Sequence, residues 1–578
     1  MSDVTHRKEF FGVGAKARQN GPVGVGTRTG GGFAARSRAG AVALVAVVAL
    51  ALAGAGCGGS GGSDSTSSST LQATFASFPD YLDPSLSYTL EGWTSMWETY
   101  VPLLTYVHAD GAAGTKLIPG LAKALPKITD GGRTYTLVLR KGLRYSDGTL
   151  VRASDFGATI ERVIAMASPA TPFFTDIVGA ERFSKTKKGG IPGIEADDRT
   201  GRIVIHLVQP RSTFSNELAM LFAAPLPAGT KHEDLSETPP PGTGPYEIVA
   251  AKPGSSWSYR RNPEWAKTNA KLLPQIPSGH FDAIDVTVNK NPETAVNEVQ
   301  RGHKDWMEEQ PPSDRFAELQ SRYEGTQLLI TPQIDVYYFW MNVTKPPFDD
   351  IRVRRAVNYA IDPAALTRIY GGQLRPTQQV LPVAMPGHRT YKPYPHDMRK
   401  AKELIAAADP KERDVTVWTY NAEPNKQAGE YYESVLRELG FHPTLKTVSA
   451  ANYITVIGNG STPNLDTGFA NWYIDYPHPN DYFAPQLSGA TITPTANSNY
   501  AHFSDPAINR EIAKLDREPL GPAQEAAYAR LDREVMRQAP WAPFGSLPLT
   551  TFVSDRIDLQ KLVVSPVYGQ DLASFAPR

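Results

Sequence analysis

The sequence has almost no cysteine and no excess of charge of either sign. Cys57 is the single cysteine among 578 residues, so an internal disulfide and a metal site built from several cysteines are both excluded. The 59 basic residues equal the 59 acidic ones, and no run rich in Lys and Arg occurs. Because the sequence has neither a net positive charge nor a cluster of basic residues, we do not expect nucleic acid as a partner.

Sequence motifs of common enzyme classes are also missing. No Gly-x-Ser-x-Gly elbow joins a strand to a helix, no His-Glu-x-x-His pair occurs, and no glycine-rich phosphate loop leads into Lys and Ser or Thr. The glycines within 242–244 lie among prolines, which indicates a loop. His478 follows Asp475 by three residues, but its neighbouring prolines predict a solvated loop rather than a metal ligand. We therefore expect a protein that is not an enzyme and has no cofactor or metal.

The remaining composition is that of a folded globular chain. Hydrophobic residues make up 41% and charged residues 20%, while 48 prolines and 48 glycines interrupt the chain at many turns. Strand-like alternation and helix-like periodicity follow each other, which predicts a mixed α/β fold rather than a long helical bundle. We expect strands at 71–75, 135–140, 203–208 and 335–342, and helices at 93–104, 153–166, 351–361, 398–408, 430–439, 507–516 and 524–538.

Residues 1–56 have the organisation of an export signal. The segment 39–56 carries no charge, follows the basic residues Arg36 and Arg38, and ends directly before Cys57. This order is typical of a signal peptide, here with an unusually long basic leader. The alternative is an uncleaved transmembrane anchor, because 18 apolar residues nearly span a bilayer.

Cys57 separates this apolar segment from a flexible tract. The run from Leu52 to Cys57 resembles a bacterial lipoprotein box, in which the cysteine is acylated and becomes the mature N-terminus, although Gly54 stands where the box usually has Leu. Residues 57–70 are mainly Gly, Ser and Thr and predict a tether. We expect Cys57 to be lipidated and the protein to lie on the outer face of the cytoplasmic membrane.

A series of short motifs, in one order over about 72–550, resembles a known family. The chain is similar to family 5, the peptide and nickel class, of the solute-binding proteins of ABC importers, which contains oligopeptide- and dipeptide-binding proteins. The motifs are Leu82-Asp83-Pro84, Tyr100–Leu104, Pro119–Ala122, Thr134–Thr149, Pro241–Tyr246, Arg261-Asn262-Pro263, Pro347-Phe348, Val353–Ala356, Ala360–Asp362, Trp472–Pro477 and Ala539–Pro543.

The resemblance implies an α/β fold of the periplasmic-binding-protein type, with two lobes, an extra inserted domain and a hinge between the lobes. Transposed onto this chain, the first lobe consists of 71–105, 236–335 and 541–578. The extra domain consists of 106–235, and the second lobe of 336–540.

The function implied is that of an extracytoplasmic receptor. It would capture a peptide or similar solute between the lobes and deliver it to the permease subunits of an ABC transporter, which an associated ATPase drives. We expect a monomer held at the membrane by its lipid. The alternatives are the same fold with a non-peptide solute, such as an oligosaccharide or a nickel chelate, and a surface-anchored hydrolase or adhesion protein.

Trp472 and Asp475 are the first candidates for ligand binding. In the family, an Asp three residues after a Trp holds the α-ammonium of the ligand, and these two residues have that spacing. A buried ammonium needs such a partner, because an unpaired buried charge costs several kcal/mol. The alternative is that Asp475 only forms a turn and Trp472 is an ordinary core residue.

Aromatic residues are the second group of candidates, because they give a peptide cleft much contact area at little rotamer cost. We predict ligand contacts from Trp93 and from Tyr337, Tyr338 and Trp340 in the strand at 335–342. Alternation places Tyr338 and Trp340 on one face and Tyr337 on the other, and it does not say which face is solvated. Core packing is the alternative for each of them.

Overall fold

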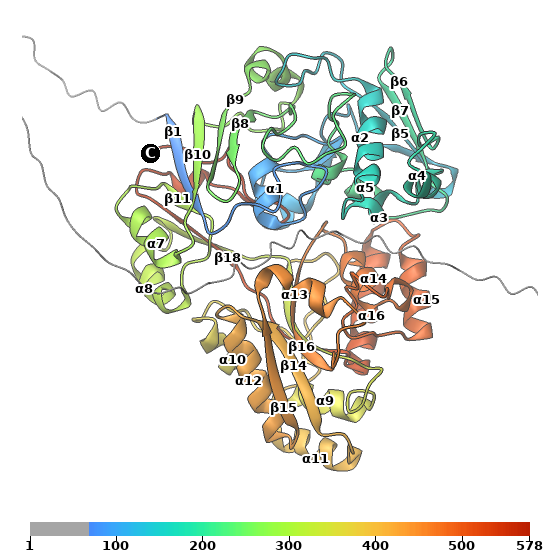
Figure 1. Ribbon diagram of the computed structural model, residues 1–578, viewed down its shortest axis with the longest axis vertical. Coiled ribbons are helices and arrows are strands. Elements are labelled where there is room, and N and C mark those ends of the chain that lie inside the picture. Colours follow the sequence, from blue (N-terminus) through green and yellow to red (C-terminus); the bar gives the residue numbers. More distant parts are fainter. Residues whose placement is uncertain (1–68) are drawn as a thin grey trace, which may run out of the picture. The chain divides into compact units, whose positions relative to one another are not determined.

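Three β-sheets of four or more strands organise the chain in the computed structural model, which describes residues 69–578 (Figure 1). Cys57, the predicted signal segment and most of the predicted tether lie outside the described residues. Among the helices at 69–578, none is long and apolar enough to span a membrane. The prediction of a mixed α/β fold is confirmed.

The first sheet has seven strands, and its central strand is the first one of the described chain. That strand, β1 (Thr70–Phe75), runs parallel to both of its neighbours. Its residues Leu71, Ala73 and Phe75 are buried, so the period-two pattern of the sequence is the pattern of the core. The order is β12 (Leu328–Thr331), β18 (Leu549–Val553), β11 (Trp306–Met307), β1, β10 (Ala283–Val288), β9 (Ser256–Arg261) and β8 (Tyr246–Lys252).

The second sheet is antiparallel and lies within the predicted inserted domain. Its strands are, in order, β4 (Lys127–Thr129), β5 (Thr134–Val138), β7 (Arg202–His206) and β6 (Ile194–Asp197). Helix α2 (Ala153–Ala165) packs on β6 and β7 (Figure 1). Its buried residues Phe156, Ile160, Val163 and Ile164 recur at helical spacing, which gives the helix one apolar face.

The third sheet has the strand order β15 (His442–Val448), β14 (Asp414–Tyr420), β16 (Thr467–Tyr473), β13 (Asp335–Met341) and β17 (Trp541–Gly545). Helix α12 (Asn425–Glu438) packs on β14 and β15, and α9 (Ile351–Ala360) packs on β17. Every residue of β13 is buried, as expected for a central strand that is covered on both faces.

The remaining elements are further helices and the strands of two two-stranded sheets, β2 with β3 and β19 with β20. They are α1 (Leu90–Met96), β2 (Leu104–Tyr106), β3 (Leu117–Pro119), α3 (Thr171–Phe174), α4 (Ala180–Thr186), α5 (Phe214–Glu217), α6 (Ala270–Leu272), α7 (Pro292–Gln300), α8 (Ser313–Tyr323), α10 (Pro363–Ile369), α11 (Met398–Ala408), α13 (Ala450–Ile457), α14 (Asn480–Leu487), α15 (Pro506–Leu515), α16 (Pro522–Gln538), β19 (Val564–Ser565) and β20 (Gly569–Gln570).

The chain passes between the first and third sheets twice. It leaves the first sheet after β12 and returns to it after β17. Asp335 joins the two passages, because its carboxylate accepts hydrogen bonds from the Ser546 hydroxyl and, at 3.1 Å, from the Leu547 N–H. The first lobe was predicted to resume at residue 541. In the structure Trp541–Gly545 still pairs with β13 of the third sheet. The division into lobes otherwise stays a prediction.

The predicted helix at 93–104 is wrong in its position. Helix α1 begins earlier, where the Thr89 hydroxyl accepts a hydrogen bond from the Gly92 N–H, and it ends at Met96. The strand β2 then starts at Leu104. Pro102 lacks a backbone N–H and disfavours a helical conformation at Val101, so no helix could continue as far as Leu104, although α1 already ends at Met96.

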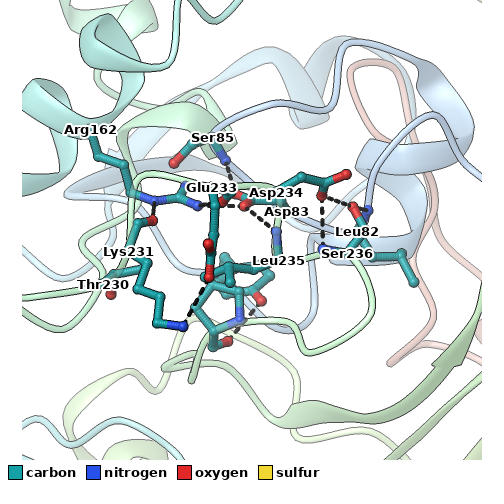
Figure 2. A network of polar contacts seen from close by, with 12 residues as sticks. Leu82, Asp83, Ser85, Arg162, Thr230, Lys231, Glu233, Asp234, Leu235 and Ser236 are labelled. Atoms are coloured by element: carbon teal, nitrogen blue, oxygen red, sulfur yellow. Dashed lines mark hydrogen bonds and ion pairs between the residues drawn. The ribbon is translucent and has the colours of Figure 1, made fainter. Parts of the chain in front are cut away.

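A buried ion pair attaches α2 to the segment around the Leu82-Asp83-Pro84 motif (Figure 2). The Arg162 Nη1 and Nη2 atoms donate to the two carboxylate oxygens of Asp83, at 2.8 and 2.5 Å. Both side chains are almost fully buried, at 2% and 0% exposure. Asp83 also accepts hydrogen bonds from the N–H groups of Ser85 and Leu235. The motif is therefore a buried junction between three segments.

Two glycines of the Pro241–Tyr246 motif are required by a close backbone approach. A Cβ atom at Gly242 would lie 2.1 Å from the Thr99 carbonyl oxygen, and one at Gly244 would lie 2.3 Å from the Glu98 carbonyl oxygen. The Tyr246 N–H donates to that same Glu98 oxygen at 3.1 Å. The loop predicted for 242–244 is present, and it fixes the main chain that follows α1.

Candidate functional site

The predicted ligand residues Trp472 and Asp475 line a cavity of about 730 Å³. Its wall combines Tyr88, which precedes α1, with residues of the inserted region and with the segment that follows β16. Apolar side chains such as Phe173 and polar groups such as Arg211 face the same space. Mostly apolar walls with a few polar groups are typical of small-molecule sites.

Trp472 and Asp475 are linked through Asp481, a residue that the sequence analysis did not single out. The Asp481 Oδ2 atom accepts hydrogen bonds from the Trp472 Nε1–H and from the Asp475 backbone N–H, both at 3.1 Å. Asp481 is located in the first turn of α14. The three-residue spacing of Trp472 and Asp475 thus lets one carboxyl group hold both residues in place.

Tyr88 contacts Asp475 from the other side of the cavity. Its hydroxyl donates to the Asp475 Oδ2 atom at 2.7 Å, and the two residues are 387 positions apart in the chain. Tyr88 lies within an aromatic group, 5.7 Å from the ring of Trp93 and 5.9 Å from that of Phe222. The predicted residue Trp93 therefore supports the cavity wall through Tyr88, while its own indole N–H donates to the Ser87 carbonyl.

The two carboxyl groups resist ionisation because they are buried next to each other. Asp475 is 8% exposed and Asp481 1% exposed. Burial raises the pKa of Asp475 to about 6, although the hydrogen bond from Tyr88 opposes this effect. Burial and the neighbouring charge of Asp475 raise the pKa of Asp481 well above its usual range. Burial and mutual repulsion therefore favour one negative charge on the pair over two.

That negative charge has no ion-pair partner within 69–578. Arg211 lines the same cavity, but its guanidinium is paired with Asp176 at 3.2 Å and with Glu217 at 2.8 Å. Lys187 also lines the cavity, and its ammonium donates to the Ile164 carbonyl oxygen at 2.6 Å. A buried carboxylate that lacks a cation is the arrangement that a cationic group of a ligand would complete.

The other predicted aromatic residues lie in the protein core. Tyr338 is stacked on Trp541 with 3.8 Å between ring centroids, and Trp340 donates from its indole to the Phe469 carbonyl. Tyr337 belongs to a second core cluster, and its hydroxyl is 2.7 Å from that of Tyr473. The predicted alternation of β13 is present, and both of its faces are buried. These three residues do not line the cavity around Asp475, so their contact with a ligand stays a prediction.

The predicted environment of His478 is wrong. Its side chain is buried rather than solvated, and its Nδ1 atom accepts a hydrogen bond from the Asn480 N–H at 3.1 Å. Burial lowers the pKa of His478 to about 3, so the imidazole is neutral at physiological pH. The prolines on either side of His478 gave no signal of burial, because helix α16 covers it from a distant part of the chain: the Tyr528 ring centroid lies 5.8 Å from that of His478.

Comparison with known proteins identifies the family. Residues 116–494 match the profile of "Bacterial extracellular solute-binding proteins, family 5 Middle". The glutathione-binding protein GsiB of Shigella dysenteriae serotype 1 is 26% identical over 433 residues, which cover 72% of this chain and 78% of that protein. GsiB of Shigella flexneri has the same identity and coverage.

Solved structures show the same fold. The clavulanic acid biosynthesis oligopeptide binding protein 2 superposes with a TM-score of 0.79 at 24% identity, over 88% of this chain and 95% of that one. The periplasmic binding protein DppA from Helicobacter pylori, in complex with the peptide STSA, superposes with a TM-score of 0.70 at 20% identity, over 87% and 97%. The fold is that of the periplasmic binding proteins, and the chain belongs to family 5 of the bacterial extracellular solute-binding proteins.

Proposed function

We propose that this protein is the peptide receptor of an ABC importer and that Asp475 binds the free α-ammonium of the peptide. The observation that carries the proposal is the buried Asp475–Asp481 pair, which faces a cavity of about 730 Å³ and forms no ion pair with any residue of 69–578. The relatives named for glutathione and oligopeptide binding support a peptide-like ligand. Delivery to a permease follows from membership in this family.

The roles of the individual groups follow from their contacts. An ionised carboxylate has two acceptor oxygens, so Asp475 can accept a hydrogen bond from an ammonium in addition to the one from Tyr88. Asp481 holds the Asp475 main chain and the Trp472 indole, and it therefore positions the acceptor. Because Asp475 is itself only 8% exposed, the pairing is stronger than it would be at the surface.

Native mass spectrometry of the purified protein tests the peptide assignment. We would offer an equimolar set of tri- to pentapeptides, each in a free-amine form and an N-acetylated form. We expect the protein to retain the free-amine peptides and to leave the acetylated peptides unbound. An excess of a second free-amine peptide should displace a retained one. Equal retention of both forms would contradict the ammonium role, and retention of no peptide at all would contradict a peptide receptor.

The affinity for a free-amine peptide should fall in acid. The ligand requires ionised Asp475, whose pKa in the free protein is raised to about 6. The carboxylate therefore predominates above pH 6 and is lost as the pH falls through 6, so binding should be about tenfold weaker at pH 5 than at pH 7. Isothermal titration calorimetry at both pH values with one retained peptide measures this change. Affinity that is the same at pH 5 and pH 7 would contradict the assignment.

Cys57 anchors the receptor in this proposal. The Cys57→Ser variant should lose its acyl chains and appear in the soluble fraction after cell fractionation, because a tether of Gly, Ser and Thr has no affinity for a bilayer. The wild-type protein should sediment with membranes. Membrane retention of the variant would favour the alternative of an uncleaved transmembrane segment at 39–56.

A further inference from the structure

We propose that Glu98, His108 and Asp571 form a binding site for one divalent transition-metal ion, with zinc as the representative ion. The sequence predicts no metal, and no motif in the sequence marks these residues. The site is separate from the residues proposed to bind peptide, and the inference does not depend on that function.

The three side chains converge from distant parts of the chain. Glu98 follows α1, His108 follows β2, and Asp571 follows β20 near the C-terminus. One imidazole nitrogen and one oxygen from each carboxylate lie within 4.8 Å of one another. Zinc bonds to imidazole nitrogen and carboxylate oxygen are about 2.0–2.2 Å long, so donors around one tetrahedral ion lie roughly 3.3–3.6 Å apart, and side-chain shifts of about 1 Å would bring the three groups to that spacing.

Glu98 is the group whose surroundings point to a missing partner. The residue is 1% exposed, and among the described residues its carboxyl group has no hydrogen-bond partner other than the carboxyl group of Asp571. Its position is fixed by the main chain, because its carbonyl oxygen accepts the Tyr246 N–H and sits against Gly244. Two buried carboxyl groups in contact resist ionisation, and a cation between Glu98 and its two neighbours would stabilise both of them as carboxylates.

His108 and Asp571 are held in place beside it. The His108 ring is stacked on Trp97 with 4.1 Å between ring centroids and 4° between the ring planes. Its Nδ1 atom is 2.7 Å from the Asp571 Oδ2 atom, and its Nε2 atom has no partner. Asp571 also accepts a hydrogen bond from the Ala573 N–H.

The charge of the cluster also favours a divalent cation. Two carboxylates face one imidazole, and no Lys or Arg of 69–578 forms an ion pair with Glu98 or Asp571. A doubly charged ion with both carboxylates ionised and a neutral imidazole gives a site with no net charge. Mixed nitrogen and oxygen donors suit zinc and its first-row neighbours better than calcium, which prefers oxygen donors alone.

Zinc binding to the full-length protein tests the site directly. The protein is purified without a histidine tag, stripped with a chelator and titrated with Zn²⁺ against a fluorescent competitor. We expect one ion per chain and an increase in the melting temperature on zinc addition. The Glu98→Gln and His108→Gln variants should bind zinc at least about 10–100-fold more weakly, which is the loss expected even for an outer-shell partner. His442→Ala is the matched control, since His442 forms an exposed contact with Asp414 and should not alter zinc binding.

Cobalt quenching of tryptophan fluorescence locates the ion in the wild-type fold. Trp97 lies against His108, so bound Co²⁺ should quench its fluorescence with a one-to-one endpoint, and Trp97→Phe should remove that component. This measurement keeps the proposal testable if the Glu98 and His108 variants fail to fold. Absence of a stoichiometric ion, zinc affinity unaffected by Glu98→Gln, or cobalt binding without quenching of Trp97 would each overturn the proposal. In those cases the cluster holds a proton between its two carboxyl groups instead.

Discussion

Replacing Asp475 by Asn should weaken binding of a free-amine peptide by about 30- to 5,000-fold, with little change in the fold. The substitution keeps the size of the side chain and its ability to accept from Tyr88, but it removes the charge that faces the ligand ammonium. Loss of one partner of a desolvated charge pair costs roughly 2–5 kcal/mol, which corresponds to this range of affinities. Calorimetry with a peptide retained in native mass spectrometry measures the loss.

Asp466→Asn is the matched control for this substitution. Asp466 precedes β16 and Asp475 follows it, but the Asp466 carboxylate accepts a hydrogen bond from the Thr416 N–H and does not line the cavity around Asp475. Its substitution should leave peptide affinity within about threefold of the wild type. A similar small effect for Asp475→Asn would mean that Asp475 is only a turn residue.

Replacing Asp83 by Asn should lower the free energy of unfolding by about 3–5 kcal/mol. Arg162 is 2% exposed, and without the Asp83 carboxylate its charge would remain buried with only carbonyl oxygens as partners. Removing one partner of a buried ion pair typically lowers the free energy of unfolding by about this amount. Urea denaturation followed by circular dichroism measures the change.

The exposed pair of Asp130 and Arg133 provides the control for Asp83. Its two side chains are 57% and 46% exposed, at a contact distance of 2.7 Å. Asp130→Asn should change the free energy of unfolding by less than about 1 kcal/mol, as is usual for surface ion pairs. Equal effects of the two substitutions would contradict the structural role assigned to Asp83.

The four strands that the sequence analysis named, and most of the helices it named, are present, because period-two and helical patterns depend on neighbouring residues. The strand at 335–342 is β13, and the helix at 398–408 is α11. The helix expected at 93–104 failed because its apolar residues also fit a short helix followed by an extended segment. Pro102 excludes a helix that runs through to Leu104, but it does not explain why α1 already ends at Met96.

The candidate site was predictable only in the part that is local in sequence. Trp472 and Asp475 are neighbours, and their spacing was visible. Tyr88 could not be predicted as a partner of Asp475, because only the folded chain brings residues 387 positions apart together. The alternation of β13 predicted two faces, but elements later in the chain determine that both are buried.

Buried charges were the least predictable feature. Glu98 and Asp83 lie in ordinary mixed sequence and resemble surface acids when read alone. Their burial depends on distant segments, which include the C-terminal residue Asp571 for Glu98 and Arg162 of α2 for Asp83. A period-based analysis detects buried apolar residues, whereas a buried charge carries no periodic signal.

A double-mutant cycle that combines Asp475→Asn with N-acetylation of the peptide tests the central claim most directly. Both changes delete the same ammonium–carboxylate pair, so each alone should cost about 2–5 kcal/mol of binding free energy and the second should add little to the first. Calorimetry on the four combinations of protein and peptide gives the coupling energy. We predict a coupling close to the cost of either single change. Additive effects, with no coupling, would contradict the assignment of Asp475 to the ligand ammonium even if the protein binds peptides.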